Sequence, residues 1–420
     1  EVFEIEEAKE RVILVGVSTC EEDDTAASLD ELEELVKTAG AVTLDKIIQN
    51  REQIHPGTYL GKGKLEEVRW RIFETEATGI VCDDELSPAQ LRNLEEALDT
   101  KVMDRTMVIL DIFARHATTR EGKIQVELAQ LKYRAVRLVG LRNSLSRLGG
   151  GIGTRGPGES KLESDRRLIH ERIGRLKAEL EEVKRHREVS RQLRGKSHTP
   201  VVAIVGYTNA GKSTLLNALT DAGILAEDKL FATLDPTTRG LELPGGQKIL
   251  LTDTVGFIRK LPHHLIDAFR STLEEAKYSD LILHVVDSSN PWRDTQMYIV
   301  YETLKQLGVE GKTVITVFNK CDLAEDLSYL RDMSSDHQVC LSAKTGEGLD
   351  TLKELLVQIL KARRVYFEHV YAYKDAGKIQ QIRKYGELIS EEYGQDGITV
   401  TGYLPAELYM KILSEAKKSP

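Results

Sequence analysis

The residues best suited to chemistry lie in one stretch of the chain, VVAIVGYTNAGKSTLLNAL at 201–219. We expect an apolar strand, then a loop of the form Gly206-x4-Gly211-Lys212-Ser213, then a helix. Glycines let backbone N–H groups turn inward on phosphate oxygens, and the helix N-terminus adds its dipole. Lys212 supplies a positive charge, and Ser213 offers a hydroxyl to Mg2+. This spacing in this context predicts a phosphate-binding P-loop.

Two downstream segments could hold the metal and sense the terminal phosphate. LLTDTVGFI (250–258) is typical of a strand that delivers Asp253 to Mg2+ through water and the N–H of Gly256 to a γ-phosphate. LFATLDPTTRG (230–240) lies between this strand and the P-loop, where a further hydroxyl must reach Mg2+. We expect Thr233 to supply it, with Thr237 and Thr238 as competing candidates.

The base is predicted by the segment Asn319-Lys320-Cys321-Asp322, which ends another apolar strand. The Asp322 carboxylate can accept hydrogen bonds from guanine N1–H and the guanine 2-amino group. Adenine lacks that amino group and would leave the carboxylate unpaired, which strongly disfavours it. The Ser342-Ala343-Lys344 segment suits a loop that presses a backbone N–H onto guanine O6. We therefore predict GTP and GDP as ligands and GTP hydrolysis as the activity.

The complete set of residues that we predict to contact GTP is Gly206, Tyr207, Thr208, Asn209, Ala210, Gly211, Lys212, Ser213, Phe231, Ala232, Thr233, Leu234, Asp235, Asp253, Thr254, Val255, Gly256, Asn319, Lys320, Cys321, Asp322, Ser342, Ala343 and Lys344. Ser213, Thr233 and Asp253 form the predicted Mg2+ set, and Lys212, Thr233 and Gly256 are expected to support the γ-phosphate.

Two positions bear on how water and cations are handled. Phe257 stands where many small GTPases carry a Gln that orients the attacking water, and a phenyl ring cannot do this. The catalytic group is therefore left unassigned, and we expect slow intrinsic hydrolysis. Asn209 could help to coordinate K+ between the α- and γ-phosphates, or it could only stabilise the loop.

The elements around these motifs predict a multidomain α/β protein. In the first part, strands are expected at 11–19, 40–49 and 79–86, and helices at 28–40, 63–79 and 87–100, which implies a largely parallel sheet. In the tail, strands are expected at 365–373 and 397–404 and helices at 377–392 and 405–417. The predicted domains are an N-terminal α/β domain (1–115), a basic helical hairpin (116–197), a doubly wound, mostly parallel P-loop GTPase domain (198–362) and an α+β domain (363–420).

The predicted hairpin has a net positive charge, whereas the rest of the chain has a net negative charge. Residues 121–198 hold 19 Lys and Arg against 10 Asp and Glu, although the whole chain has a net charge of −9. Apolar residues recur three or four apart before and after GGGIGTRGPGES (149–160), which predicts two antiparallel helices joined by a glycine-rich tip. The basic excess favours a polyanionic partner over a merely solvated surface.

Other bulk features narrow the class of protein. No apolar run reaches eighteen residues, so no membrane span is predicted. The acidic start of the chain is typical of neither a signal nor a transit peptide. Four scattered cysteines favour a reducing cytoplasm. We expect a cytoplasmic monomer.

With these residues in place, the chain resembles the HflX family of ribosome-associated GTPases over nearly its whole length. The resemblance rests on HPGTYLGKGKLEEV (55–68), DRTMVILDIFARHATTREGKIQVELAQLKYR (104–134), GGIGTRGPGESKLESDRRLI (150–169) and the GTPase motifs GYTNAGKS, FATLD, DTVGF and NKCD. It implies a GTPase that binds the 50S subunit and 23S rRNA and splits or rescues stalled 70S ribosomes under stress, with hydrolysis stimulated by the ribosome. One alternative is a GTPase that acts in 50S subunit assembly. Another is a GTPase partnered with a protein complex or membrane, with the hairpin as a protein-binding coiled coil.

In that family the hairpin tip reaches toward the peptidyl transferase centre. A tip poor in bulky side chains could follow a narrow RNA cavity while the basic helices carry it there. The resemblance therefore makes the tip residues RNA-contact candidates, and they are Gly150, Gly151, Ile152, Gly153, Thr154, Arg155 and Gly156. The bland alternative is a flexible connector.

Overall fold

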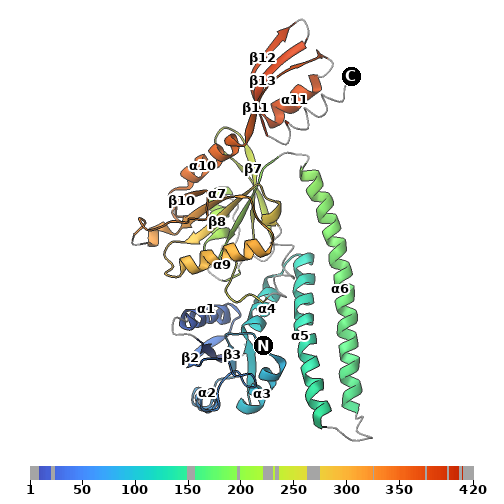
Figure 1. Cartoon of the computed structure of the whole chain (residues 1–420), viewed down its shortest axis with the longest axis vertical. Coiled ribbons are helices and arrows are strands. Elements are labelled where there is room, and N and C mark those ends of the chain that lie inside the picture. Colours follow the sequence, from blue (N-terminus) through green and yellow to red (C-terminus); the bar gives the residue numbers. More distant parts are fainter. Residues whose placement is uncertain are drawn as a thin grey trace, which may run out of the picture.

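The structure is a computed structural model that describes residues 9–19, 24–148, 157–195, 199–220, 230–231, 236–262, 275–324, 326–373, 376–394, 397–405 and 409. Figure 1 shows three successive sheets along the long axis, with the N-terminal sheet at one end and the three-stranded tail at the other. Two long helices, α5 and α6, run beside the first two sheets. The predicted multidomain α/β fold is confirmed.

The N-terminal unit is a four-stranded parallel sheet of order β2-β1-β3-β4. Its central strand is buried on both faces, which explains its continuous apolar run. The helix predicted at 87–100 begins after Ser87, whose side chain forms a capping box with Gln90, and Pro88 lies in the first turn. Its elements are β1 (Arg11–Ser18), α1 (Thr25–Thr38), β2 (Val42–Asn50), α2 (Lys62–Thr75), β3 (Gly79–Cys82), α3 (Pro88–Leu98), β4 (Lys101–Asp104) and α4 (Arg105–His116).

The predicted helical hairpin is formed by α5 (Arg120–Leu148) and α6 (Pro157–Gly195). Arg172 of α6 binds Glu127 of α5 through two nitrogens, at 2.7 and 3.0 Å, which fixes the pairing of the helices at the surface. Between the helices lies a small core of buried apolar side chains, consisting of Ile124, Leu128, Ala135, Ile173, Leu176 and Leu180. The glycine-rich tip, with all seven RNA-contact candidates, lies outside the described residues.

The P-loop domain has a six-stranded sheet of order β10-β9-β8-β5-β7-β6. Among the described strands of this domain, only β6 runs antiparallel to its neighbour, so the predicted mostly parallel, doubly wound sheet is confirmed. The described elements are β5 (Val201–Gly206), α7 (Lys212–Thr220), β6 (Thr237–Glu242), β7 (Lys248–Asp253), β8 (Leu281–Asp287), α9 (Arg293–Gln306), β9 (Thr313–Asn319), the 3-10 turn η1 (Cys321–Leu323), β10 (His337–Cys340) and α10 (Leu349–Ala362).

The tail is an antiparallel sheet of order β11-β13-β12 that packs against α11. Its elements are β11 (Arg364–Tyr371), α11 (Ala376–Tyr385), β12 (Glu387–Gly394) and β13 (Gly397–Pro405). The predicted helix over 377–392 is therefore wrong beyond Tyr385. The helix gives way to β12 because strand pairing with β13 outweighs the helix preference of the glutamates. At Gly386 a side chain would lie 2.7 Å from the Tyr403 carbonyl oxygen, so glycine lets the chain turn close to β13. Most of the helix predicted at 405–417 lies outside the described residues.

The first two sheets share apolar packing. A single buried cluster contains Leu29 and Phe113 of the N-terminal domain together with Tyr207, Phe231 and Phe257 of the P-loop domain. Phe113 and Phe231 meet edge to face, with ring centroids 4.7 Å apart. The nucleotide motifs are therefore built against the N-terminal domain.

Candidate nucleotide site

The P-loop is positioned by β5, which ends at Gly206, and by α7, which begins at Lys212. Both glycines of the motif have positive φ, +154° at Gly206 and +91° at Gly211, which favours glycine. A Cβ at Gly206 would lie 2.3 Å from the Val285 carbonyl oxygen, and one at Gly211 would lie 2.2 Å from Nδ2 of Asn319. Space as well as conformation therefore requires glycine at both positions.

Asn319 joins the P-loop to the loop that follows β10. Its Nδ2 donates to the Ala210 carbonyl at 2.9 Å, and its Oδ1 accepts from the Ala343 N–H at 2.9 Å. Asp322 lies exposed on η1 directly after it, and Lys320 is held by Asp287 at 2.7 Å. The structure thus brings together the segments predicted to read guanine.

Lys212 is buried within the P-loop, and its Nζ donates to the Tyr207 carbonyl at 2.8 Å. Burial lowers the pKa of Lys212 to about 8, and the nearby Asp253 opposes this shift only in part. Phosphate oxygens at this position would favour the charged amine. The lysine therefore stands where a phosphate-binding charge is needed.

Two predicted metal residues lie together at the ends of β7 and the start of α7. The Ser213 hydroxyl donates to Oδ2 of Asp253 at 2.8 Å. A hydroxyl and a carboxylate are oxygen ligands of the kind that Mg2+ prefers, so this pair fits the metal. Among the described residues no group of three or more His, Cys, Asp and Glu is placed to hold a metal ion.

The DTVG segment packs directly on the P-loop. Phe257 donates its N–H to the Gly206 carbonyl at 3.1 Å and accepts from the Thr208 N–H at 2.8 Å. A Cβ at Gly256 would lie 3.0 Å from Cα of Thr208 and 2.9 Å from Nζ of Lys212, so glycine favours this close approach to the P-loop backbone. The Phe257 ring is buried in the shared core, which gives it a packing role instead of contact with an attacking water.

The segment LFATLDPTTRG (230–240), which we call the first switch segment, is described only in part; the second switch segment is the one that contains DTVGF. Ala232, Thr233, Leu234 and Asp235 lie outside the described residues, so the preferred Mg2+ threonine is not placed. The competing Thr237 and Thr238 lie in β6, where the Thr238 hydroxyl is 3.0 Å from that of Thr252.

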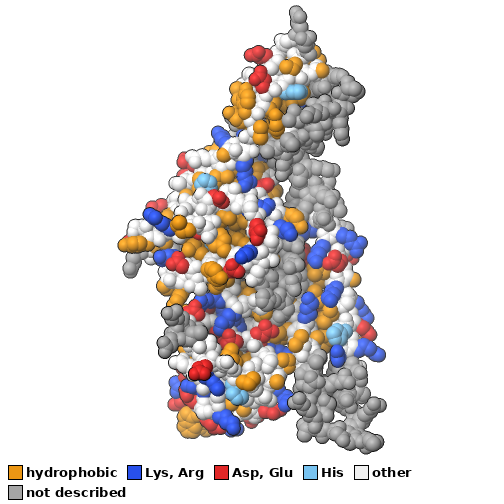
Figure 2. Space-filling view, viewed as in Figure 1, with side chains coloured by type: hydrophobic (Ala, Val, Ile, Leu, Met, Phe, Trp, Pro, Cys, Tyr) orange, Lys and Arg blue, Asp and Glu red, His pale blue; other side chains and the backbone are white. Residues whose placement is uncertain are grey.

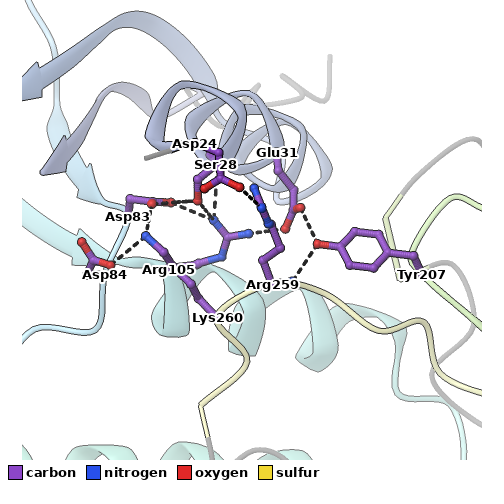
Figure 3. Close-up of polar contacts among 9 residues, drawn as sticks. All are labelled: Asp24, Ser28, Glu31, Asp83, Asp84, Arg105, Tyr207, Arg259 and Lys260. Carbon is purple, nitrogen blue, oxygen red and sulfur yellow. Dashed lines mark hydrogen bonds and ion pairs between the residues drawn. The ribbon is translucent and has the colours of Figure 1, made fainter. Parts of the chain in front are cut away.

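The sequence did not reveal what the side chain of Tyr207 contacts. Its hydroxyl donates to Oε2 of Glu31 on α1 at 2.6 Å and accepts from the Arg259 N–H at 2.7 Å (Figure 3). Arg259 and Lys260, which follow DTVGF directly, also reach carboxylates of the N-terminal domain. The two adjacent cations after DTVGF could have indicated a contact with another part of the chain. Their acidic partners could not be identified, because they lie about 175 to 235 residues away in sequence.

Comparisons with known proteins agree with this geometry. Family models match three consecutive regions, namely GTP-binding GTPase N-terminal over 26–114, GTP-binding GTPase Middle Region over 116–194 and 50S ribosome-binding GTPase over 201–320. Across the described residues, no helix is both long and apolar enough to cross a membrane.

Two relatives cover nearly the whole chain. GTPase HflX of Lacrimispora saccharolytica is 75% identical over 99% of this chain and 98% of its own length. GTPase HflX of Caldanaerobacter subterraneus subsp. tengcongensis is 48% identical over 96% of this chain and 93% of its own. Among solved structures, a GTP-binding protein from Sulfolobus solfataricus in complex with GDP is 27% identical, covering 83% of this chain and 98% of its own, with a TM-score of 0.43. The family models and the two HflX relatives show that the chain belongs to the HflX family of GTPases and is an enzyme that hydrolyses GTP.

Proposed function

We propose that this GTPase is a translation factor that binds the 50S ribosomal subunit and splits or rescues stalled 70S ribosomes. The observation that carries the proposal is a guanine-nucleotide site and two long basic helices on one chain. The family model that covers the nucleotide domain is described as a 50S ribosome-binding GTPase, which supports the same partner. We propose cytoplasmic action as a monomer.

The hairpin supports an RNA partner through its length and its charge. Helix α6 has 39 residues, which at 1.5 Å per residue span about 58 Å. Figure 2 shows Lys and Arg side chains gathered along the described part of α6, where Arg167, Arg175, Lys177, Lys184 and Arg185 are exposed. Such a rod can follow a phosphate-lined path, with residues 150–156 directed at the peptidyl transferase centre.

We propose that GTP gates this binding. Thr233 and Gly256 would contact the γ-phosphate and its Mg2+, which neutralises phosphate charge when bound. These contacts order both switch segments and fix the P-loop domain against the N-terminal domain in the 50S-bound pose. Hydrolysis removes the contacts and releases the factor.

The buried Phe257 leaves the water-orienting group to be supplied from elsewhere. We propose that the ribosome supplies it, so that intrinsic hydrolysis is slow and ribosome-stimulated. Asn209 is exposed at the P-loop with a φ of 59°, a position open to a cation-binding role. If K+ bridges the phosphates there, GTP hydrolysis will be faster in KCl than in NaCl at equal ionic strength. Equal rates would remove K+ from the mechanism.

Sedimentation of 70S ribosomes with this protein tests the proposed function. We expect subunit splitting and co-migration with 50S particles with a non-hydrolysable GTP analogue, and neither with GDP. Co-migration should weaken steeply as salt rises, because many phosphate contacts release counterions. Failure to co-migrate at physiological ionic strength would contradict the proposal.

Deletion of residues 150–158 provides the matched variant. We expect loss of ribosome splitting with unchanged GTP affinity, because the tip is far in sequence from the nucleotide motifs. Unchanged splitting would make the tip a mere connector. Accumulation of precursor subunits in a strain that lacks the whole protein would instead indicate a role in 50S assembly.

A further inference from the structure

Four carboxylates of the N-terminal domain face the residues that follow DTVGF, and we call them the N-terminal carboxylates: Asp24, Glu31, Asp83 and Asp84. Asp24 forms an ion pair with Arg259, and Lys260 pairs with both Asp83 and Asp84, the latter at 2.7 Å (Figure 3). Arg259 is 12% exposed and Asp24 is 34% exposed, so this contact is partly shielded from water. The Coulomb attraction within such a pair is larger than in bulk water, and desolvation of the two charges offsets part of it.

Buried side chains hold two of the N-terminal carboxylates, Glu31 and Asp83, in place. The Arg105 guanidinium, 1% exposed, binds Glu31 and reaches Asp83 at 2.7 Å. The Ser28 hydroxyl donates to Asp83 at 2.8 Å. Burial disfavours the charged form of Asp83, but Arg105 and Lys260 outweigh it and hold the pKa of Asp83 below its ordinary value. Arg105 and Ser28 therefore fix the position of Asp83, and Arg105 and Lys260 together favour its charged form.

Tyr207 is the point at which three parts of the molecule meet. Its backbone belongs to the P-loop, where its carbonyl binds Lys212. Its hydroxyl oxygen accepts a hydrogen bond from the Arg259 N–H, and the hydroxyl donates one to Glu31. Because one hydroxyl makes both bonds, a displacement of Arg259 disturbs the contact with Glu31 as well.

The chain leaves little slack between this point and the γ-phosphate position. Gly256, predicted to contact that phosphate, precedes Arg259 by three residues. The intervening Phe257 and Ile258 are buried, and Phe257 is bonded to the P-loop. Movement of Gly256 must therefore be passed to Arg259 and Lys260. Lys260 itself has a φ of 51°, a conformation that its contacts with the carboxylates hold in place.

The first switch segment contacts the same domain through apolar packing. Phe231 begins the segment that contains Thr233, and its ring packs edge to face on Phe113 of α4. Both segments that are predicted to meet the γ-phosphate therefore contact the N-terminal domain.

We infer that Tyr207 is a positioning residue that, with the ion pairs of Arg259 and Lys260, transmits γ-phosphate occupancy to α1 and the residues after β3. This inference deepens the proposed GTP gating and rests on it. It names the contacts that carry the signal out of the nucleotide site. Because α1 lies in a different domain from the phosphates, its response is a specific readout of this connection.

Amide hydrogen exchange on the full chain without ribosomes tests the inference. In the wild type, exchange in α1 (Thr25–Thr38) should differ between GDP and a non-hydrolysable GTP analogue. Tyr207→Phe retains the buried ring and removes both hydroxyl bonds. We expect it to abolish the nucleotide-dependent difference in α1 while the difference at the P-loop remains. Tyr298→Phe, at an exposed position on α9, is the matched control and should behave as the wild type.

The exchange experiment has clear contrary outcomes. Wild-type exchange in α1 that is the same with both nucleotides would overturn the inference, and so would a Tyr207→Phe variant that retains the difference. A loss of protection over the whole variant would mean misfolding, in which case the binding cycle below decides. Since ribosomes are absent, failure of ribosome splitting leaves this result unaffected.

Nucleotide binding provides the reciprocal test, because coupling between two sites acts in both directions. Asp24→Asn and Arg259→Gln each remove one side of an ion pair. Each should change the ratio of GTP-analogue to GDP affinity by about threefold or more. The double variant should change it no further than the larger single change, since both act through one contact. A smaller single effect, or additive effects, would overturn the inference. Arg239→Gln, at an exposed position in β6, is the control.

Discussion

At the residue scale, His284 of β8 is a buried imidazole outside the phosphate contacts. It is 1% exposed, its ring centroid lies 5.0 Å from that of Tyr301, and its Nδ1 lies 3.9 Å from Oδ2 of Asp332. That carboxylate instead accepts the hydroxyls of Tyr301 at 2.6 Å and Thr316 at 2.5 Å. Burial lowers the pKa of His284 to about 4, which Asp332 opposes only in part.

This histidine predicts an acid sensitivity of the P-loop domain. The unfolded chain binds a proton at His284 below its ordinary pKa of about 6.5, whereas the folded chain does so only near 4. Protonation of His284 therefore costs no stability above pH 6.5. It lowers the free energy of unfolding by about 3 kcal/mol as the pH drops to 4. His284→Phe should lose less thermal stability than the wild type between pH 7.5 and 4.5. Equal losses in thermal melts would contradict this account.

Individual residues also show where sequence reasoning succeeds. Lys212, Ser213 and Asp253 could be predicted, because a motif fixes their spacing along one strand, loop and helix. The bridging role of Asn319 between two loops could not, although its presence near guanine could. Tyr207 was assigned to the nucleotide, yet its hydroxyl contacts Glu31, a partner that only tertiary structure brings close.

At the element scale, the hairpin depends on a narrow apolar seam. Leu176 of α6 is 1% exposed between the two helices, whereas Leu168 on the same helix is 56% exposed. Leu176→Ala should destabilise the hairpin by about 2–5 kcal/mol through lost burial and a cavity. Leu168→Ala should change stability by less than about 0.5 kcal/mol.

Hydrogen exchange in α5 and α6 measures the effect of both substitutions. We expect faster exchange in both helices of the Leu176 variant and wild-type exchange in the Leu168 variant. A similar response from the two variants would mean that the helices are held together mainly by their ion pairs, such as that between Arg172 and Glu127.

The existence of most elements followed from periodicity, and their ends did not. The hairpin helices follow from apolar residues at helical spacing, which strong repetition makes reliable. The helix predicted in the tail was wrong over 387–392. The glutamates there favour a helix in isolation, but pairing of β12 with β13 favours a strand in the fold. Strand β4 and helix α4 were not predicted as elements, although α4 lies within the segment 104–134 that carries the family resemblance.

At the scale of the whole molecule, the order of units along the chain could be predicted but their contacts could not. Segregated charge and alternating strands and helices point to separate units. Nothing in those patterns indicates that Arg105, a buried cation in one unit, helps to hold the carboxylates that bind Lys260 in another. Such pairing depends on three-dimensional docking, which leaves no local signal in the chain.

The packing of Phe113 on Phe231 has a consequence for how relatives of this protein can be recombined. The two aromatic rings come from different units but fill one shared interior, so neither can change size without the other. A chimera that joins the first unit of one relative to the second unit of another should fold well only when these two positions are inherited together. Substitution histories at the two positions should accordingly be correlated across natural lineages.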